Sequence, residues 1–594
     1  MTLLTARHPA MLAAGVMMSI GAAIFFVWIP VLLGGAVDQA LDLLSEDASA
    51  GDARTALLRS AAVLLGVSVL RGSFAYGQMF IGEVLGQKLA YQLRMEFFEK
   101  LQRLSFSFHD RAHTGNLMSR GITDIEGVRM FAHTGLLRVF YLVILLVLSA
   151  FLMIQLDWQL GLITLAFVPV VAFRGTLMRL KLRTTWLRIQ EEMGVVNTRV
   201  QENLAGVRVV RSFSGQRYEE AKFEESSHRV LDLMNTAANV RAGNGSFMTF
   251  SLLVAWAVIL WFGGNRVLSG SLTIGEFTQF VAFMGLLQMP IRTLPMMINS
   301  WARASSAGSR LFEVLDAELP IKNRPGAKPL EVTGGVLRFE DVTFGYDGTP
   351  ILRDISFEAR PGHTIAIVGP PGSGKSTIAQ LAPRLYEIES GRITVDGQDI
   401  RDVTLESLRD AVGLVQQDTF LFVDAISSNI AYGEPGAAEE RIVTSAQSAQ
   451  LHQHIENMPE RYESMVGERG VSLSGGQRQR MAIARALLVK PRILIFDDST
   501  SAIDAATERL IRADLAKRAG DTTTVIIAHR LSSVQDADEI LVLEEGRIAE
   551  RGSHADLLKQ GGRYREMHDL QVRPSDDLSG GWLDMKMGGA EDGA

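Results

Sequence analysis

The 594-residue sequence contains no cysteine, and this absence removes several kinds of chemistry at once. Without thiols, the protein has no disulfide bond, no thiolate nucleophile and no cysteine-ligated zinc site. A basic surface is missing as well, because 59 Lys and Arg stand against 66 Asp and Glu and no basic stripe stands out. Nucleic-acid binding depends on clustered cations that neutralise phosphates, so no nucleic-acid partner is expected.

Charged residues are scarce in the long apolar stretches that dominate the chain up to about residue 310. From about residue 335, short runs of Val, Ile and Leu alternate with glycine-rich turns and charged helices, as is typical of a soluble α/β domain. A chain of this length also exceeds a single hydrophobic core. We therefore predict a transmembrane domain over residues 1–315, a linker over 316–334, an α/β domain over 335–572 and a disordered tail over 573–594.

Six segments are apolar enough to cross a bilayer, which takes a helix of about 20 residues. They lie at about 9–37, 56–82, 139–156, 158–173, 246–264 and 277–300. Only a turn around Asp157 and Trp158 separates the third span from the fourth, so a tight helical hairpin is predicted there. The first span is too long for a cleaved signal peptide and is expected to remain as a membrane anchor.

The polar connections between the spans predict their orientation. The long segments after the second and fourth spans are rich in Lys and Arg, whereas the short loop at 38–54 is acidic. By the positive-inside rule, both long segments, both termini and the α/β domain are cytoplasmic. Helical spacing of apolar residues predicts that the spans extend into the cytoplasm and reverse near residues 110–115 and 212–216. We expect the α/β domain to dock on these two turns.

Arg71 in the second span and Arg292 in the sixth are unusual, because charge inside a bilayer is costly. They either line a polar cavity and contact cargo, or pair with an acidic group on a neighbouring helix or extend to the interface. Pro290 and Pro295 are expected to kink the sixth helix. Such a kink would serve gating or be an ordinary feature of a membrane helix.

The α/β half contains the sequence GPPGSGKST at residues 369–377, between a strand-like run and a helical stretch. This is the context of a P-loop, whose backbone N–H groups and helix N-terminus hold the phosphates of ATP. Lys375 would place its charge on the β- and γ-phosphates, and Ser376 would offer a hydroxyl to Mg²⁺. The predicted nucleotide-binding residues of this loop are Gly369, Gly372, Ser373, Gly374, Lys375, Ser376 and Thr377.

A second motif follows about 120 residues later, where the buried-strand run RILIF ends in Asp497 and Asp498. A carboxylate in this position downstream of a P-loop is placed to hold Mg²⁺, which predicts Asp497 as a metal ligand beside Ser376. The predicted fold is therefore an all-α six-helix transmembrane domain followed by an α/β P-loop nucleotide-binding domain. Its predicted cofactors are ATP and Mg²⁺.

Between these two motifs stands LSGGQ at residues 473–477, followed by an Arg-rich helix at 478–488. It resembles the signature of ATP-binding cassette (ABC) proteins. Other segments are similar to that family in the same order: Tyr346 resembles the aromatic residue that stacks on adenine, Gln417 the Q-loop, SAID at 501–504 the D-loop, and His529 the switch histidine.

This resemblance implies further site residues. Catalysis would involve Asp498, His529 and Gln417, and Gln417 would also reach Mg²⁺. Nucleotide would also be contacted by Tyr346 and by the signature residues Ser474, Gly475, Gly476 and Gln477.

The resemblance extends over nearly the whole chain, because the N-terminal half is similar to the six-helix domain of exporter-type (type IV) half-transporters. The segments SFHDRAHTGNLMSRGITDI and LTIGEFTQF resemble that subgroup's first intracellular loop and sixth-helix entry. The likeness implies a multi-pass ATPase of the bacterial plasma membrane that exports small molecules or lipids. Its partners would be the lipid bilayer, the cargo and a second half-transporter, with each ATP held between one chain's P-loop and the other chain's signature.

One departure from the family pattern stands at Asp498, where most members have Glu as the base that orients the attacking water. A carboxylate one methylene shorter is pulled back by roughly 1 Å, which can cost on the order of 10²-fold in rate. The P-loop of this chain is therefore expected to hydrolyse ATP slowly. Because the signature is intact, a heterodimer with a partner that carries the Glu is favoured over a homodimer.

Other functions stay open at this point. They are a siderophore-type importer on the exporter fold, a homodimeric exporter, and an ATP-gated channel or regulator. The six spans exclude a soluble cassette ATPase of the DNA-repair or translation type. The identity of the cargo is not encoded in any motif.

Overall fold

The computed structural model describes residues 7–45, 50–467, 470, 473–500, 502–518 and 522–572, so the predicted tail and Ser501 lie outside the described residues. The chain divides into two compact units. The first consists of Met1–Gln102 and Thr114–Ala317, and the second of Arg103–His113 and Glu318–Ala594. The short segment Arg103–His113 therefore belongs with the α/β part, although the sequence of the helical part surrounds it.

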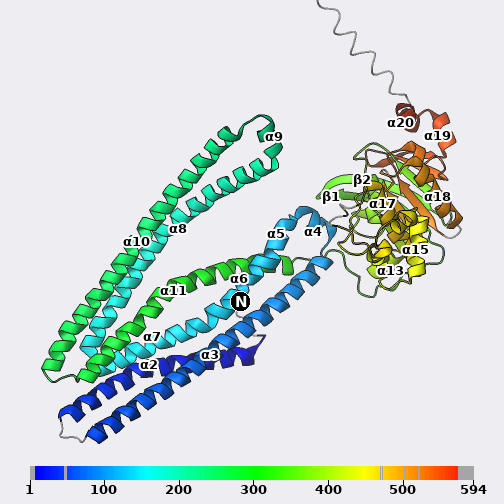
Figure 1. Ribbon diagram of the computed structural model, residues 1–594. Helices are drawn as coiled ribbons and strands as arrows, with labels where there is room; N and C mark the ends of the chain where they lie inside the picture. The colour runs from blue at the N-terminus through cyan, green and yellow to red at the C-terminus, as the bar shows by residue number, and fades with distance from the viewer. Residues whose placement is uncertain are drawn as a thin grey trace, which may run out of the picture. The chain divides into compact units, whose positions relative to one another are not determined.

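The first unit is built from long helices that run side by side (Figure 1). They are α2 (Pro9–Ser45), α3 (Ala50–Arg103), α7 (Leu137–Leu156), α8 (Trp158–Ala205), α10 (Gln216–Leu268) and α11 (Ile274–Leu315). Shorter helical segments connect them: α5 (Thr114–Ser119), η1 (Arg120–Asp124), α6 (Ile125–Met130), η2 (Phe131–Leu136) and α9 (Val207–Ser212).

Five helical stretches are long and apolar enough to cross a membrane within the described residues: Pro9–Leu43, Arg54–Arg103, Thr114–Leu156, Trp158–Ala205 and Gln216–Leu268. The sixth predicted span lies in α11, which continues as helix through Pro290. The side chains of Arg292 and Pro295 lie outside the described part of the chain.

Two aspartates, Asp157 and Asp38, form hydrogen bonds that stabilise the connections between the long helices. The Asp157 carboxylate accepts hydrogen bonds from the N–H groups of Gln159 (3.0 Å) and Leu160 (2.9 Å), which caps α8 and forms the predicted hairpin with α7. At the start of α11, the Asp38 carboxylate accepts from the Thr273 hydroxyl and the Gly275 N–H, both at 2.6 Å. The end of α2 is thereby tied to the start of α11.

The two predicted cytoplasmic reversals differ in their outcome. One is confirmed, because α9 ends at Ser212 and α10 begins at Gln216. The other begins earlier than predicted: α3 ends at Arg103, and the short helix α4 (Phe106–Arg111) precedes α5, so residues 110–115 alone do not form the turn. The physical reason is Ser105, whose extended backbone (φ −67°, ψ 157°) separates α3 from α4.

The second unit contains a six-stranded sheet with the order β10-β9-β3-β8-β7-β6. Its strands are β3 (Thr364–Val368), β6 (Val412–Val415), β7 (Ile493–Asp497), β8 (Thr523–Ile527), β9 (Glu539–Glu544) and β10 (Arg547–Gly552). All neighbours pair in parallel except the β9–β10 hairpin. The carboxyl ends of parallel strands meet at one edge of a sheet, which is where ligands bind in such folds.

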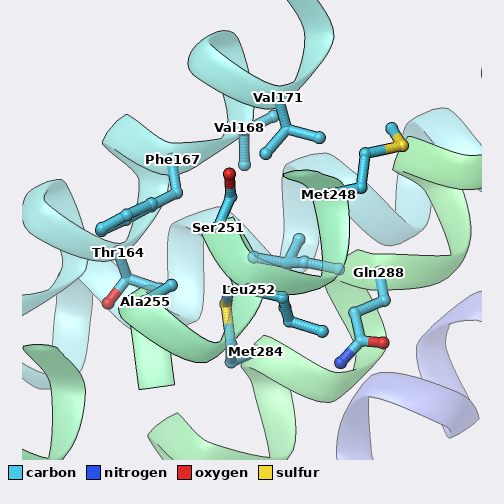
Figure 2. A pocket seen from close by; sticks show the side chains of 11 residues that line it. Thr164, Phe167, Val168, Val171, Met248, Ser251, Leu252, Ala255, Met284 and Gln288 are labelled. Atoms are coloured by element: carbon cyan, nitrogen blue, oxygen red, sulfur yellow. The ribbon is translucent and has the colours of Figure 1, made fainter. Parts of the chain in front are cut away.

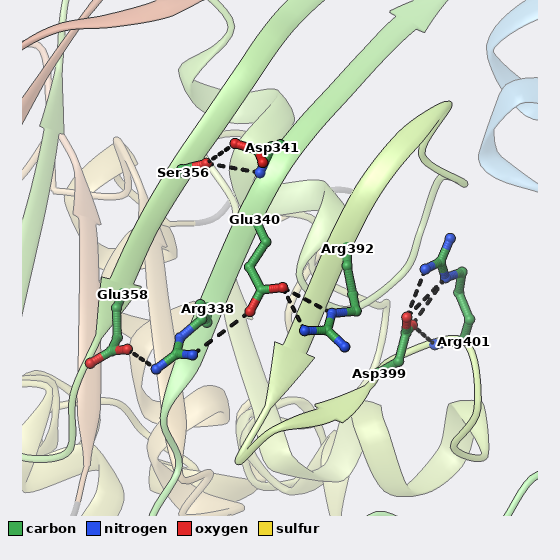
Figure 3. A network of polar contacts seen from close by, with 8 residues as sticks. All are labelled: Arg338, Glu340, Asp341, Ser356, Glu358, Arg392, Asp399 and Arg401. Carbon is green, nitrogen blue, oxygen red and sulfur yellow. Dashed lines mark hydrogen bonds and ion pairs between the residues drawn. The ribbon is translucent and has the colours of Figure 1, made fainter.

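A second, antiparallel sheet has the order β2-β1-β4-β5 and consists of β1 (Leu337–Tyr346), β2 (Thr349–Ala359), β4 (Ser390–Val395) and β5 (Gln398–Asp399). Figure 3 shows a row of alternating charges across it, in which Glu340 pairs with both Arg338 and Arg392. Exposed ion pairs of this kind contribute at most about 1 kcal/mol each to the free energy of unfolding. The row therefore serves mainly to favour this register of the strands over others.

Helices surround both sheets and contribute to separate hydrophobic cores. They are α12 (Lys375–Leu381), α13 (Leu405–Ala411), α14 (Ile426–Ile430), η3 (Ala431–Gly433), α15 (Glu439–Ser448), α16 (His452–Glu456), η4 (Arg461–Glu463), α17 (Gly475–Leu488), α18 (Ala505–Arg518), η7 (Leu531–Ser533), α19 (His554–Gln560) and α20 (Arg563–Val572). Ile378 of α12 lies in one core, and Met481 of α17 lies in the other. The P-loop helix and the signature helix are thus anchored separately.

Candidate active site

The carboxyl edge of the six-stranded sheet collects most of the predicted site residues. The P-loop follows β3, Gln417 follows β6, Asp497 ends β7, and His529 follows β8. Since β8 lies between β3 and β7, the sheet order brings the loop of His529 between the P-loop and the two aspartates. The four strands thus bring together residues that lie up to 160 positions apart in the sequence, such as Gly369 and His529.

The P-loop requires glycine at its end because Gly374 has φ +98° and caps α12. A Cβ atom there would also lie 2.5 Å from Leu352 Cδ2. The Lys375 Nζ donates to the carbonyls of Gly369 (3.0 Å) and Pro370 (2.9 Å), and burial lowers the pKa of this ammonium. The Ser373 hydroxyl is buried and has no hydrogen-bond partner among the described residues. These groups fit the phosphates of a nucleotide.

Ser376 and Asp497 form the candidate metal site. The Ser376 hydroxyl donates to Asp497 Oδ1 at 2.8 Å. Burial raises the pKa of the Asp497 carboxyl, and the nearby Asp498 carboxylate raises it further against the opposing effects of Ser376, His529 and Lys375. The described residues contain no group of three or more His, Cys, Asp or Glu that could hold a metal. Two oxygen donors of this kind fit Mg²⁺, which usually takes its remaining ligands from phosphates and water.

Asp498 adopts a left-handed backbone conformation (φ +45°), and its N–H donates to the carbonyl of Ile527 at 2.9 Å. Its side chain meets Gln417, whose Nε2 donates to Asp498 Oδ2 at 3.5 Å. The structure thus brings together two of the three residues, Asp498 and Gln417, for which the family resemblance implied roles in hydrolysis.

The loop of His529 is held by a residue that the sequence reasoning missed. Gln571 in α20 donates from Nε2 to the His529 carbonyl and accepts at Oε1 from the Leu531 N–H, both at 2.9 Å. His529 and Gln571 line a cavity of about 370 Å³ together with Gly369 and Pro370. No local motif marks Gln571, because its partner lies 42 residues away.

Tyr346 stands at the end of β1, away from the parallel edge, and connects to the P-loop helix. Its hydroxyl donates to Gln380 Oε1 of α12 at 3.1 Å, and burial raises the pKa of the phenol. The ring packs edge-to-face against Tyr386 with centroids 5.3 Å apart. The ring of Tyr346 is partly buried and lines a cavity of about 520 Å³.

The signature begins α17 through a capping box, in which Ser474 and Gln477 exchange hydrogen bonds between side chain and backbone. A Cβ atom at Gly476 would lie 2.8 Å from the Ala502 carbonyl oxygen. Nearby, the Ala502 N–H donates to Gln479 Oε1 at 2.9 Å. Within the described residues, no hydrogen bond or ion pair joins residues 474–477 to the P-loop of the same chain.

Comparison with known proteins decides the family. Residues 12–291 match the ABC transporter transmembrane region, and residues 352–501 match the ABC transporter domain. An "ATP-dependent lipid A-core flippase" from Syntrophus aciditrophicus is 36% identical over 85% of this chain and 84% of its own length. YgaD of Bacillus subtilis, provisionally named a multidrug export ATP-binding/permease protein, is 36% identical over 91% of this chain and 94% of its own length.

This chain belongs to the ABC transporter family. The solved structure of a bacterial Atm1-family ABC exporter with ATP bound superposes with a TM-score of 0.79 at 31% identity, covering 95% of this chain and 99% of the other. The fold is therefore a helical transmembrane domain followed by an α/β ABC nucleotide-binding domain, which confirms the predicted fold class. The protein is an exporter-type ABC half-transporter and an ATPase coupled to transport, and it requires a dimer partner.

The short helix α4 of this ABC transporter contacts the nucleotide-binding domain inside the second unit. Tyr386 donates its hydroxyl to Asp110 Oδ2 at 2.6 Å, and its ring lies 6.1 Å from that of Phe106. This contact confirms the expected docking of the turn around Asp110. No local motif marks Tyr386, because its partner lies 276 residues earlier in the chain.

Proposed function

We propose that this ABC transporter exports amphipathic or hydrophobic small molecules or lipids across a bacterial plasma membrane. The observation that carries this proposal is the similarity of this chain, over most of its length, to a lipid flippase and a multidrug export protein. Phe167, Met248, Leu252 and Met284 of the helices α8, α10 and α11 line a small apolar cavity of about 50 Å³, shown in Figure 2, which holds no more than a few water-sized groups. The names of two relatives, a lipid flippase and a multidrug exporter, support the same class of cargo.

The site residues have the following proposed roles. Ser376, Asp497 and Gln417 hold Mg²⁺, and the P-loop from Gly369 to Thr377, through Gly372, Ser373, Gly374 and Lys375, holds the phosphates of ATP. Tyr346 stacks on adenine, and the signature residues Ser474, Gly475, Gly476 and Gln477 complete the partner's site. Asp498, Gln417 and His529 act on the attacking water and the γ-phosphate. The meeting of Gln417 with Asp498 and of Ser376 with Asp497 supports these roles.

In the proposed cycle, ATP draws two nucleotide-binding domains together and the membrane cavity changes from inward-open to outward-open. The Asp110–Tyr386 hydrogen bond lies where this movement passes from the nucleotide-binding domain to α4. A direct test uses inside-out vesicles with a fluorescent lipid in the outer leaflet. ATP-dependent movement into the lumen is expected, and movement in the opposite direction identifies an importer.

We further propose that this chain pairs with a different half-transporter and that its own P-loop hydrolyses ATP slowly. The Asp498 carboxylate is one methylene shorter than the Glu of most family members, and the Gln417 amide reaches it only at 3.5 Å. Misplacement by roughly 1 Å can cost on the order of 10²-fold in rate. The partner is expected to carry Glu after its own metal-binding Asp and to have an altered signature.

The test compares ATP turnover of the purified chain alone with that of the chain and its partner. Slow turnover alone, increased by Asp498→Glu, is expected. Brisk turnover of the single chain, abolished by Asp498→Asn, contradicts both the heterodimer and the slow site, and it identifies a homodimer instead. The reciprocal Glu→Asp change in the partner serves as the matched control.

A further inference from the structure

Two glutamines stand two positions apart at the start of the signature helix α17, and they point in different directions. Residues two apart on a helix are separated by about 200° around its axis, so they do not share a face. Gln477 lies partly exposed in the capping box with Ser474, whereas Gln479 is only 6% exposed. The buried amide of Gln479 is therefore a feature of this helix separate from the signature itself.

The amide of Gln479 is buried where the signature helix meets the residues that follow Asp497 and Asp498. Leu473, Met481 and Ile503 of these two segments share one hydrophobic core and are at most 6% exposed. A polar group in such surroundings costs free energy unless it is hydrogen-bonded. The Oε1 atom of Gln479 meets this condition, because it accepts the Ala502 N–H at 2.9 Å. A methionine would fill a similar volume without this cost, so the amide serves its hydrogen bond more than the packing.

Ala502 lies four residues after Asp498, in the segment that leads from β7 to α18. Near the start of this segment, the Thr500 hydroxyl donates to Glu508 of α18 at 3.0 Å. Its middle is held from another element, because the partner of the Ala502 N–H belongs to the signature helix. Gln479 thus connects the segment that follows the proposed base with the helix that carries the signature.

The signature glycines lie directly against Ala502. A Cβ atom at Gly475 would lie 3.5 Å from Ala502 Cβ, and one at Gly476 would lie 2.8 Å from the Ala502 carbonyl oxygen. The first turn of the signature helix therefore packs on the residue whose N–H Gln479 holds. A change in the position of Ala502 would shift these glycines, since glycine has no side chain that could absorb the movement.

We propose that Gln479 is a positioning residue for ATP hydrolysis, which holds the signature and the segment around Ala502 together as one rigid unit. The inference rests on the proposed function, in which the signature of this chain completes the fast site on the partner's P-loop. Gln479 acts through Gly475 and Gly476, whose place relative to the nucleotide affects the rate. Misplacement by roughly 1 Å can cost on the order of 10²-fold, and the loss of one hydrogen bond should loosen the unit by less than that.

The test compares three variants of the full transporter, assembled with its partner in nanodiscs. Gln479→Met keeps the length of the side chain but has no acceptor, and ATP turnover should fall about threefold to tenfold. Gln479→Glu keeps an acceptor oxygen and should retain most of the turnover. Gln447→Met, at an exposed position of α15, is the matched control and should change nothing. The affinity of this chain's own P-loop for ATP should be the same in all variants, because the proposed role concerns the signature.

Hydrogen–deuterium exchange measures the same hydrogen bond without catalysis. The peptide that contains Ala502 should exchange at least about threefold faster in Gln479→Met than in the wild type or in Gln479→Glu. Unchanged exchange and turnover in Gln479→Met overturn the proposal. Equal losses of turnover in the Met and Glu variants also overturn it, because the acceptor oxygen is then not what matters. A loss of ATP affinity that matches the loss of turnover shows a general folding defect and likewise overturns the positioning role.

Vanadate trapping of a radiolabelled, photoreactive ATP analogue separates this proposal from the proposed pairing of two different half-transporters. In the wild type, the nucleotide should be trapped mainly on the partner chain, whose site this signature completes, and Gln479→Met should lower that label. Equal trapping on both wild-type chains contradicts the slow site. A lower label in Gln479→Met would then still support the positioning role, and an unchanged label would overturn it.

Discussion

At the scale of single residues, the candidate active site depends on small differences in side-chain length and environment. Asp497 and Asp498 are adjacent, yet one is buried against Ser376 and the other faces Gln417. Their backbones explain the difference, because Asp497 continues β7 whereas Asp498 turns into the left-handed region. Adjacent carboxylates thereby point at two different partners.

Tyr346 offers the first prediction at this scale. Tyr346→Ala should weaken ATP binding roughly tenfold, because stacking on a base contributes about 1–3 kcal/mol. Tyr346→Phe should bind ATP nearly as well as the wild type, since it keeps the ring and loses only the hydrogen bonds of the hydroxyl to Gln380 (3.1 Å) and Thr377 (3.5 Å). Titration with a fluorescent ATP analogue measures both. An equal loss in both variants contradicts stacking and assigns the effect to the hydroxyl.

Asp396 supplies a pH-dependent prediction. Its carboxylate accepts four backbone N–H groups, from Thr333, Gly334, Gly335 and Val336, at 2.7–3.0 Å. Burial by itself would raise the pKa of Asp396, but these donors hold it below its usual range. Stability gained this way is complete above the unfolded pKa of about 4 and is lost as the pH falls through the depressed folded pKa.

Asp396→Asn should therefore lower the free energy of unfolding by about 1–2 kcal/mol at neutral pH. The gap between the variant and the wild type should begin to shrink below about pH 4, where Asp396 takes up a proton in the unfolded chain, and should close as the pH falls through the depressed folded pKa. Thermal unfolding of the full-length protein in detergent at several pH values measures this gap. A gap that is independent of pH would show that the charge of Asp396 contributes nothing.

At the scale of elements, strand order and helix packing position the loops that carry chemistry. The P-loop and the signature each begin a helix, yet these helices belong to different cores. The loop after β8 packs Ala528, Leu531 and Val534 into a further core, together with Tyr564 of α20. Helix α20 braces it through the two hydrogen bonds of Gln571.

Gln571→Ala should slow hydrolysis of ATP at this chain's own P-loop by about threefold to tenfold. The reason is that each hydrogen bond of Gln571 stabilises the His529 loop by a net amount of roughly 0.5–1.5 kcal/mol. ATP affinity should stay the same, since Gln571 holds the backbone around His529 and not the P-loop itself. A single-turnover experiment with prebound ATP separates rate from affinity. Gln560→Ala, an exposed residue of the same type in α19, is the matched control. Equal rates in both variants contradict the bracing role.

At the scale of the whole molecule, the separation of P-loop and signature within one chain makes dimerisation part of the chemistry. In the proposed heterodimer, each chain contributes half of two sites, and the residue after the metal-binding Asp decides which site is fast. If this proposal holds, mutations in this chain alone should reveal the asymmetry between the two sites.

Gly476→Val and Lys375→Ala should have unequal effects on the ATP turnover of the assembled transporter. A side chain at position 476 collides with the Ala502 carbonyl and disrupts the signature that completes the fast site, so turnover should fall by about 10²-fold or more. Lys375→Ala affects mainly the slow site and should lower turnover by less than about twofold, because a site that hydrolyses ATP on the order of 10²-fold more slowly contributes little to the total. Equal losses in both variants contradict the asymmetric heterodimer. Gel filtration verifies that both variants assemble.

The sequence by itself determined the motifs and the elements that carry them. Glycine positions, the strand that ends in Asp497 and the Asp157 cap are local features, because each depends on backbone geometry within a few residues. The tertiary structure alone decided which distant residues meet. The order β3-β8-β7 places the His529 loop beside the P-loop, and Gln571 holds that loop. Tyr386 donates a hydrogen bond to Asp110. The tertiary structure also decided that Arg71 faces a cavity without an acidic partner among the described residues, because such contacts depend on helix packing, which no local pattern encodes.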